Sequence, residues 1–116
     1  MARMQRSYFT GAAAIAVGTA KIDPVGPQFK LLGVTCKFSA APTTSESFVI
    51  TLDSNLGAAY DVPLYSVDPS VGSLTSIVKT WDDDDAMIFD KGDVITAAYT
   101  NTDTRTYGLQ IKYKIL

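Results

Sequence analysis

The residues that could do chemistry stand closest together at Trp81, which is followed by four carboxylates, Asp82, Asp83, Asp84 and Asp85. Ca²⁺ prefers carboxylate oxygens as ligands, and an indole ring offers an apolar face for stacking. In an extended chain, however, consecutive side chains point to opposite sides, so at most two of the four carboxylates could reach one ion. Acidic side chains also discourage a sheet edge from pairing with another chain. We therefore expect a solvated acidic loop, with these five residues as a candidate ligand loop and no bound metal.

Side chains for nucleophilic or acid–base catalysis are scarce. The chain has one cysteine, Cys36, and no histidine that could activate its thiol. Cys36 lies in an apolar alternating stretch, which is typical of a small buried core residue. No pair of carboxylates is recognisable as a general acid and a general base. The sequence therefore predicts no catalytic residue and no cofactor, and we expect a protein that is not an enzyme.

Residues 1–10 form a polar, basic arm that carries two arginines and an aromatic pair. Such termini lack a periodic apolar face, and fixing each residue costs about 1–2 kcal/mol of conformational entropy. We therefore expect the arm to become ordered only against a surface outside its own domain. Tyr8 and Phe9 suit an apolar pocket, whereas Arg3 and Arg6 suit carboxylates on an acidic neighbour. These four residues are the predicted partner-binding site.

Length and charge exclude several classes of protein. A chain of 116 residues fits one domain, and 47% apolar residues suffice for a core. The net charge of −2 gives no overall basic field, so we expect no binding to nucleic acid. The basic start followed by an Ala-rich stretch resembles a secretory signal, but the apolar part is short. No run is long enough to span a bilayer, so we expect a soluble protein that does not bind a membrane.

Short runs of alternating apolar and polar residues, separated by Gly, Pro, Asn and Asp, predict an antiparallel all-β fold. The last run is the clearest, with Tyr107, Leu109, Ile111, Tyr113 and Ile115 on the side expected to be buried and Gly108, Gln110, Lys112 and Lys114 on the other. It is expected to form a closing β-hairpin with residues 94–100. Pro63 predicts an edge position for its strand, because proline cannot donate a ladder hydrogen bond. The predicted strands span residues 11–22, 29–39, 46–53, 59–66, 74–81, 87–89, 94–100 and 106–116.

Eight such strands fit a single-domain antiparallel β-sandwich that is jelly-roll-like, over residues 11–116, with residues 1–10 as the arm. An immunoglobulin-like sandwich is the alternative, although the paired cysteines are missing. The outward positions of the strands are rich in Thr, Ser, Ala and Gly. Because small uncharged side chains let another subunit approach closely, this pattern favours assembly over catalysis.

Several stretches resemble small virion proteins of tailed bacteriophages. These stretches are residues 39–46 (SAAPTTSE), 51–54 (TLDS), 57–61 (GAAYD), 91–93 (KGD), 99–103 (YTNTD) and 105–109 (RTYGL). The resemblance implies a jelly-roll structural protein of the virion, most closely a capsid decoration (cement) protein that stabilises the head shell. It also implies a homotrimer that binds the major capsid protein and assembles in the bacterial host cytoplasm. The alternatives are a tail or baseplate component, or a carbohydrate- or receptor-binding module that uses Trp81.

Overall fold

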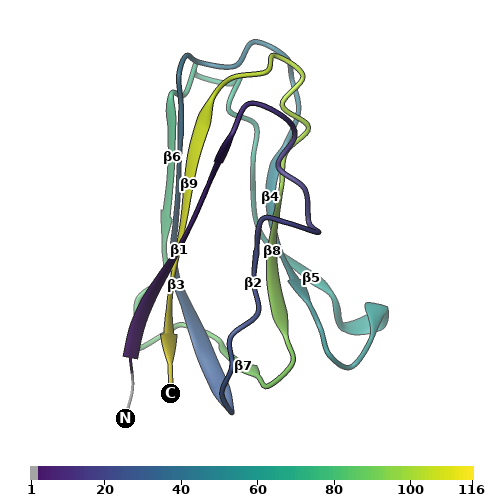
Figure 1. Ribbon diagram of the computed structural model, residues 1–116, viewed down its shortest axis with the longest axis vertical. Helices are drawn as coiled ribbons and strands as arrows, with labels where there is room; N and C mark the ends of the chain where they lie inside the picture. Colours follow the sequence, from purple (N-terminus) through teal and green to yellow (C-terminus); the bar gives the residue numbers. More distant parts are fainter. Residues whose placement is uncertain (1–2) are drawn as a thin grey trace.

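Two antiparallel sheets face each other in the computed structural model, which describes residues 3–116 (Figure 1). The larger sheet has the strand order β1-β9-β3-β6, with the short strand β7 also paired to β3. The smaller sheet has the order β2-β8-β4-β5. The elements are β1 (Arg3–Gly11), β2 (Lys21–Ile22), β3 (Gln28–Phe38), β4 (Phe48–Asp53), the 3-10 turn η1 (Ala58–Tyr60), β5 (Val62–Val67), β6 (Ser76–Thr80), β7 (Ile88–Asp90), β8 (Val94–Ala98) and β9 (Tyr107–Ile115).

The strands pair in a nested order, in which the first strand pairs with the last and the second with the last but one. β1 pairs with β9, β2 with β8, β3 with β6 and β7, and β4 with β5. This nested pairing distributes the strands over two facing antiparallel sheets. The predicted fold class, an antiparallel all-β sandwich, is therefore confirmed, with one strand more than the eight expected.

The core lies between the sheets and follows the alternation of the strands. In β9, Tyr107, Leu109 and Ile111 are buried and Gln110 is exposed, as the sequence predicts. Beyond Ile111 the predicted contrast is lost, because Lys112, Tyr113, Lys114 and Ile115 are all partly buried. Phe48 and Ile50 of β4 face them from the smaller sheet and are fully buried. Cys36 is buried among them, and loss of hydration raises the pKa of its thiol to about 12. A thiol in that state is a core residue and not a nucleophile.

The prediction of a closing hairpin between residues 94–100 and the last strand is wrong. β8 and β9 follow each other in the chain but lie in opposite sheets, and β9 pairs with β1 and β3 instead. Residues 99–106 carry the chain across the end of the sandwich, where the buried Asn101 holds them. Its amide nitrogen donates to the carbonyl oxygens of Ala13 at 2.9 Å and Arg105 at 3.0 Å. The alternation of apolar and polar residues determines which face of the sheet a side chain occupies. The strand that β9 pairs with depends instead on how residues 99–106 cross between the two sheets.

The expectation that residues 3–10 need an outside surface to become ordered is also wrong. They form most of β1, which pairs with β9 in unbroken register from Arg3 opposite Ile115 to Gly11 opposite Tyr107. The ladder and the half-buried Phe9, which packs against the core, supply the order. Met1 and Ala2, the first residues of the predicted arm, lie outside the described residues.

The predicted first strand over residues 11–22 is mostly a loop. Ile15 forms an isolated bridge to Tyr99, and a regular strand exists only at β2. Val17, which a two-residue period would place on the same face as the buried Ile15, is 54% exposed. The stretch is rich in Ala and Gly, whose side chains bury too little apolar surface to hold it against a sheet. Pro63 does lie in an edge strand, β5, as predicted. None of residues 3–116 belongs to a helix with the length and apolar character that crossing a membrane requires.

We expect acid to weaken the hydrogen bonds that join the loop of residues 39–47 to the loop of residues 99–106. Asp103 accepts hydrogen bonds from the backbone N–H groups of Thr43 at 2.7 Å and Thr44 at 2.9 Å, which lower its pKa to about 2. Its stabilising contribution is present above the unfolded pKa of about 3.9 and is lost as the pH falls toward 2. We expect thermal melting curves to show a smaller fall in Tm over this range for Asp103→Asn than for the wild type. Parallel pH profiles for the two proteins would contradict this assignment.

Candidate functional site

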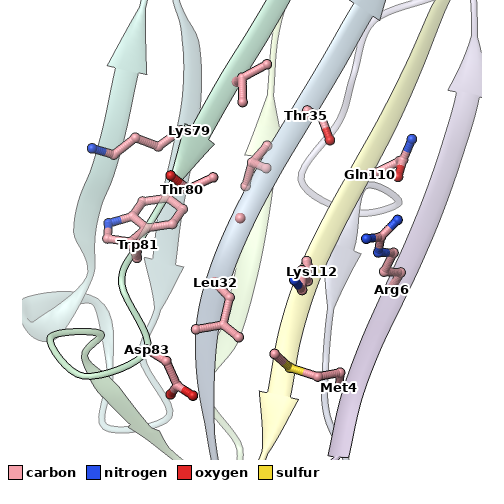
Figure 2. Close-up of a pocket in the computed structure, with 13 residues that line it drawn as sticks. Met4, Arg6, Leu32, Thr35, Lys79, Thr80, Trp81, Asp83, Gln110 and Lys112 are labelled. Atoms are coloured by element: carbon pink, nitrogen blue, oxygen red, sulfur yellow. The ribbon is translucent and has the colours of Figure 1, made fainter.

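The outer face of the larger sheet carries a shallow groove of about 410 Å³ (Figure 2). Its floor and walls come from β1, β9, β3 and β6, together with the segment that follows β6. A second hollow at β1 shares Met4, Arg6 and Lys112 with the groove and extends it toward the sheet edge. Among the side chains lining the groove are Met4, Arg6, Leu32, Thr35, Gln110 and Lys112.

Strand register brings these side chains together. Arg6 of β1 lies opposite Lys112 of β9, and Tyr8 lies opposite Gln110, which in turn lies opposite Thr35 of β3. Because side chains alternate along a strand, these positions all point away from the core. The pairing of β3 with β9 shifts register between Leu31 and Gly33, so Leu32 is an extra residue. This bulge leaves Leu31 in the core cluster and places Leu32, which is only 6% exposed, in the groove.

The groove lies in a basic face of an acidic protein. The strands β1, β3, β6 and β9 contain no Asp or Glu. Five of the ten basic residues of the chain occupy outward positions on these strands, and they are Arg6, Lys30, Lys37, Lys112 and Lys114. Although the whole chain has a net charge of −2, half of its basic residues are therefore concentrated on this one face.

One carboxylate enters this face from the loop after β6. Lys30 and Lys114 are direct cross-strand neighbours, and Asp83 bridges them. Lys30 Nζ lies 3.2 Å from Asp83 Oδ1, and Lys114 Nζ lies 2.8 Å from Oδ2. The hydrogen bonds from Lys114 and then Lys30 lower the pKa of the Asp83 carboxyl. Like charges placed opposite each other destabilise a sheet, so Asp83 offsets the repulsion within this pair.

The next cationic pair has no such partner. Arg6 and Lys112 are also direct cross-strand neighbours, yet both ion pairs found within residues 3–116 belong to Asp83. Exposed apolar side chains lie beside the pair on β1, with Met4 at 55% and Tyr8 at 66%, and Val78 of β6, at 64%, lines the far side of the groove. The groove therefore offers two uncompensated cations beside apolar contact area. Such an arrangement suits binding of a carboxylate-bearing surface.

The predicted partner-binding residues of the arm do not share one face. Arg6 and Tyr8 point outward beside the groove, whereas Phe9 packs against the core. Arg3 is exposed at the start of β1. The reason is the alternation of a strand, which sends neighbouring side chains to opposite sides. Phe9 therefore supports the sandwich, and of the four residues only Arg6 and Tyr8 lie beside the groove.

The predicted ligand loop is also divided. Trp81 and Asp83 line the groove, while Asp82, Asp84 and Asp85 are exposed. The indole of Trp81 is half-buried against the core, and the Lys79 ammonium lies 5.5 Å from its ring centre. Among residues 3–116, His, Cys, Asp and Glu side chains nowhere gather in a group of three or more that could hold a metal ion. That this loop binds no Ca²⁺ stays a prediction.

Sequence reasoning missed most of the groove. The alternation of the last strand places Lys112 and Lys114 outward, but no sequence pattern relates them to Arg6, Met4 or Val78. Lys30 and Lys37 are seven positions apart, so a two-residue period places them on opposite faces, and only the bulge at Leu32 turns both outward. The convergence of these side chains depends on β9 lying between β1 and β3, which no local pattern predicts.

The outer face of the smaller sheet has the opposite character. Val49 and Thr51 of β4, Ala98 of β8 and Ser66 of β5 lie side by side there. All four are uncharged, and Ser66 is exposed. The charged residues Lys21 of β2 and Asp53 of β4 occupy outward positions elsewhere on the same face. The face matches the small, bland outward positions expected from the sequence, and it allows a close approach by another surface.

Comparison with known proteins gives little similarity. No family model matches the chain, and no curated protein matches it. Among solved structures, the chain is similar to one in the acidic stable capsid structure of Helicobacter pylori bacteriophage KHP30. The sequence identity is 14% and the TM-score 0.41, over 99% of this chain and 94% of the other. Similarity of this degree does not define a role.

Proposed function

We propose that the chain is a non-enzymatic structural protein of a bacteriophage virion, of the capsid decoration type. It associates with copies of itself, as a homotrimer, and binds the major capsid protein of the head shell. The stretches that resemble small virion proteins of tailed bacteriophages support the class of protein. The proposal extends to assembly in the host cytoplasm.

The observation that carries this proposal is the difference between the two outer faces of one sandwich. The larger sheet presents a basic groove with exposed apolar side chains, and the smaller sheet presents a patch of small uncharged side chains around Ser66. A protein that joins its own copies and also binds a lattice needs two distinct contact surfaces. We assign self-association to the groove face and attachment to the capsid to the face around Ser66.

Such a protein would stabilise the head shell because its binding surface on the capsid exists only in the assembled shell. A protein that straddles neighbouring capsid subunits binds the assembled shell and not the separate subunits. Its binding free energy is then added to the stability of the shell by mass action. Expansion or rupture of the shell would have to break these contacts, so occupied shells resist heating better than bare ones.

Adding the purified chain to particles that lack it tests this function. We expect the wild type to bind heads and to raise the temperature at which the shells open. Ser66→Arg should lower the occupancy at a fixed concentration at least tenfold, because a bulky charge in a closely packed interface costs more than about 1.4 kcal/mol. The readout is the number of bound copies per particle, measured by quantitative gel and by electron microscopy.

Ser76→Arg is the matched control, since Ser76 is an exposed serine on β6 of the opposite sheet. It should leave head occupancy close to that of the wild type. Binding to tails and not to heads would favour the tail or baseplate alternative. Binding to cell-surface glycans, with no binding to particles, would favour a carbohydrate- or receptor-binding module.

A further inference from the structure

The outer face of the larger sheet contains two similar cationic pairs, of which one is neutralised. In the row of Lys30 and Lys114, Asp83 of the same chain lies between the two ammonium groups. In the row of Arg6 and Lys112, two cations face each other in the same way without a carboxylate. Figure 2 shows Arg6 and Lys112 on neighbouring strands, with Asp83 near the other end of the groove. The groove is thus built for one more carboxylate than its own chain supplies.

The same loop that supplies Asp83 also presents unused carboxylates to solvent. Asp82, Asp84 and Asp85 are exposed, and within residues 3–116 none of them forms an ion pair. A turn closed by the Asp85 N–H and the Asp82 carbonyl oxygen, at 3.0 Å, holds the loop together. Surfaces of opposite charge therefore lie on one chain, and within residues 3–116 the remaining carboxylates of the loop form no ion pair with Arg6 or Lys112.

We propose that the Asp82–Asp85 loop of a second copy of this chain binds in the groove, with its carboxylates on Arg6 and Lys112. Met4, Tyr8 and Val78 then pack around the bound loop and lose their exposed apolar area. The contact joins two different surfaces, so repetition of it closes into a ring if the rotation permits. This inference rests on the self-association part of the proposed function and is independent of attachment to a particle.

Purified protein alone suffices for the test, by sedimentation at several concentrations in 50 mM and 500 mM salt. We expect the wild type to associate at low salt and its dissociation constant to rise at least about tenfold at high salt, because exposed charge pairs are screened. The double variant Arg6→Glu/Lys112→Glu and the double variant Asp82→Lys/Asp84→Lys should each weaken association at least about tenfold through like-charge repulsion. Circular dichroism confirms that each variant folds.

Mixing the two double variants gives the decisive measurement. Each groove in the mixture is then complementary to the loop of the other variant, so mixed assemblies should form although neither variant associates alone. The control is Lys21→Glu/Lys91→Glu, which makes the same change in net charge at two exposed lysines away from the groove and should associate like the wild type.

Three results would overturn the inference. They are a wild type that stays monomeric throughout, a control variant that is weakened as much as the groove variant, and a mixture that does not associate. If the chain is monomeric or assembles through another surface but still binds particles, the groove inference fails and the attachment function stands. Conversely, restored association in the mixture without any binding to particles would leave the inference intact and refute the attachment function.

Discussion

Deletion of residues 1–11 should lower the free energy of unfolding of the sandwich by about 4 kcal/mol or more. The deletion removes β1, whose nine residues pair with β9, and with it the half-buried Phe9 that packs against the core. It also removes the hydrogen bond from Thr10 Oγ1 to the carbonyl oxygen of Tyr107, which is 2.8 Å long. β9, now a central strand of the larger sheet, would become an edge strand with its core side partly open. Chemical denaturation monitored by circular dichroism measures the loss.

A full-length variant with Met4→Ser and Tyr8→Ser is the control for this deletion. Both side chains point outward and are more than half exposed, so their replacement should change stability by less than about 1 kcal/mol. A truncated protein as stable as the wild type would show that β1 is a passive terminus. In that case the partner surface for residues 3–11 would have to lie on another chain.

Ile111→Ala should lower the free energy of unfolding by about 2–5 kcal/mol, the range for removing a buried aliphatic side chain and leaving a cavity. Ile111 is 0% exposed and lies in β9 between Ser7 of β1 and Val34 of β3. The sheet on either side of it is fixed by ladder hydrogen bonds, so the surrounding structure has little freedom to collapse into the space. The decrease can be measured by the same denaturation experiment.

Gln110→Ala provides the matched comparison one position earlier in the same strand. Gln110 is exposed on the groove face, so its truncation should cost no more than about 0.5 kcal/mol. If the Gln110 variant were the less stable of the two, the faces assigned to β9 would be reversed. The groove would then have to be built from the apolar positions of the strand.

The sequence was informative wherever a property depends on neighbours along the chain. The alternation from Tyr107 to Ile111 correctly separated buried from exposed side chains, and Pro63 correctly predicted an edge strand. It was misleading where side chains are small, as in residues 11–22, because Ala and Gly alternate without burying much apolar area. It also misjudged residues 3–10, whose order comes from a strand about a hundred positions away.

By itself, then, the sequence determined an antiparallel all-β sandwich, the inward and outward faces of its main strands, a buried Cys36 and an acidic loop after Trp81. The tertiary structure alone decided that β8 and β9 lie in opposite sheets and that β1 and β3 flank β9. That arrangement sets Arg6 opposite Lys112 and brings Asp83 between Lys30 and Lys114. The physical reason is that side-chain alternation is a local property of a strand, with a period of two residues. The partners of a strand are instead fixed by long-range ladder hydrogen bonds and core packing, and the charged groove exists only once those partners are in place.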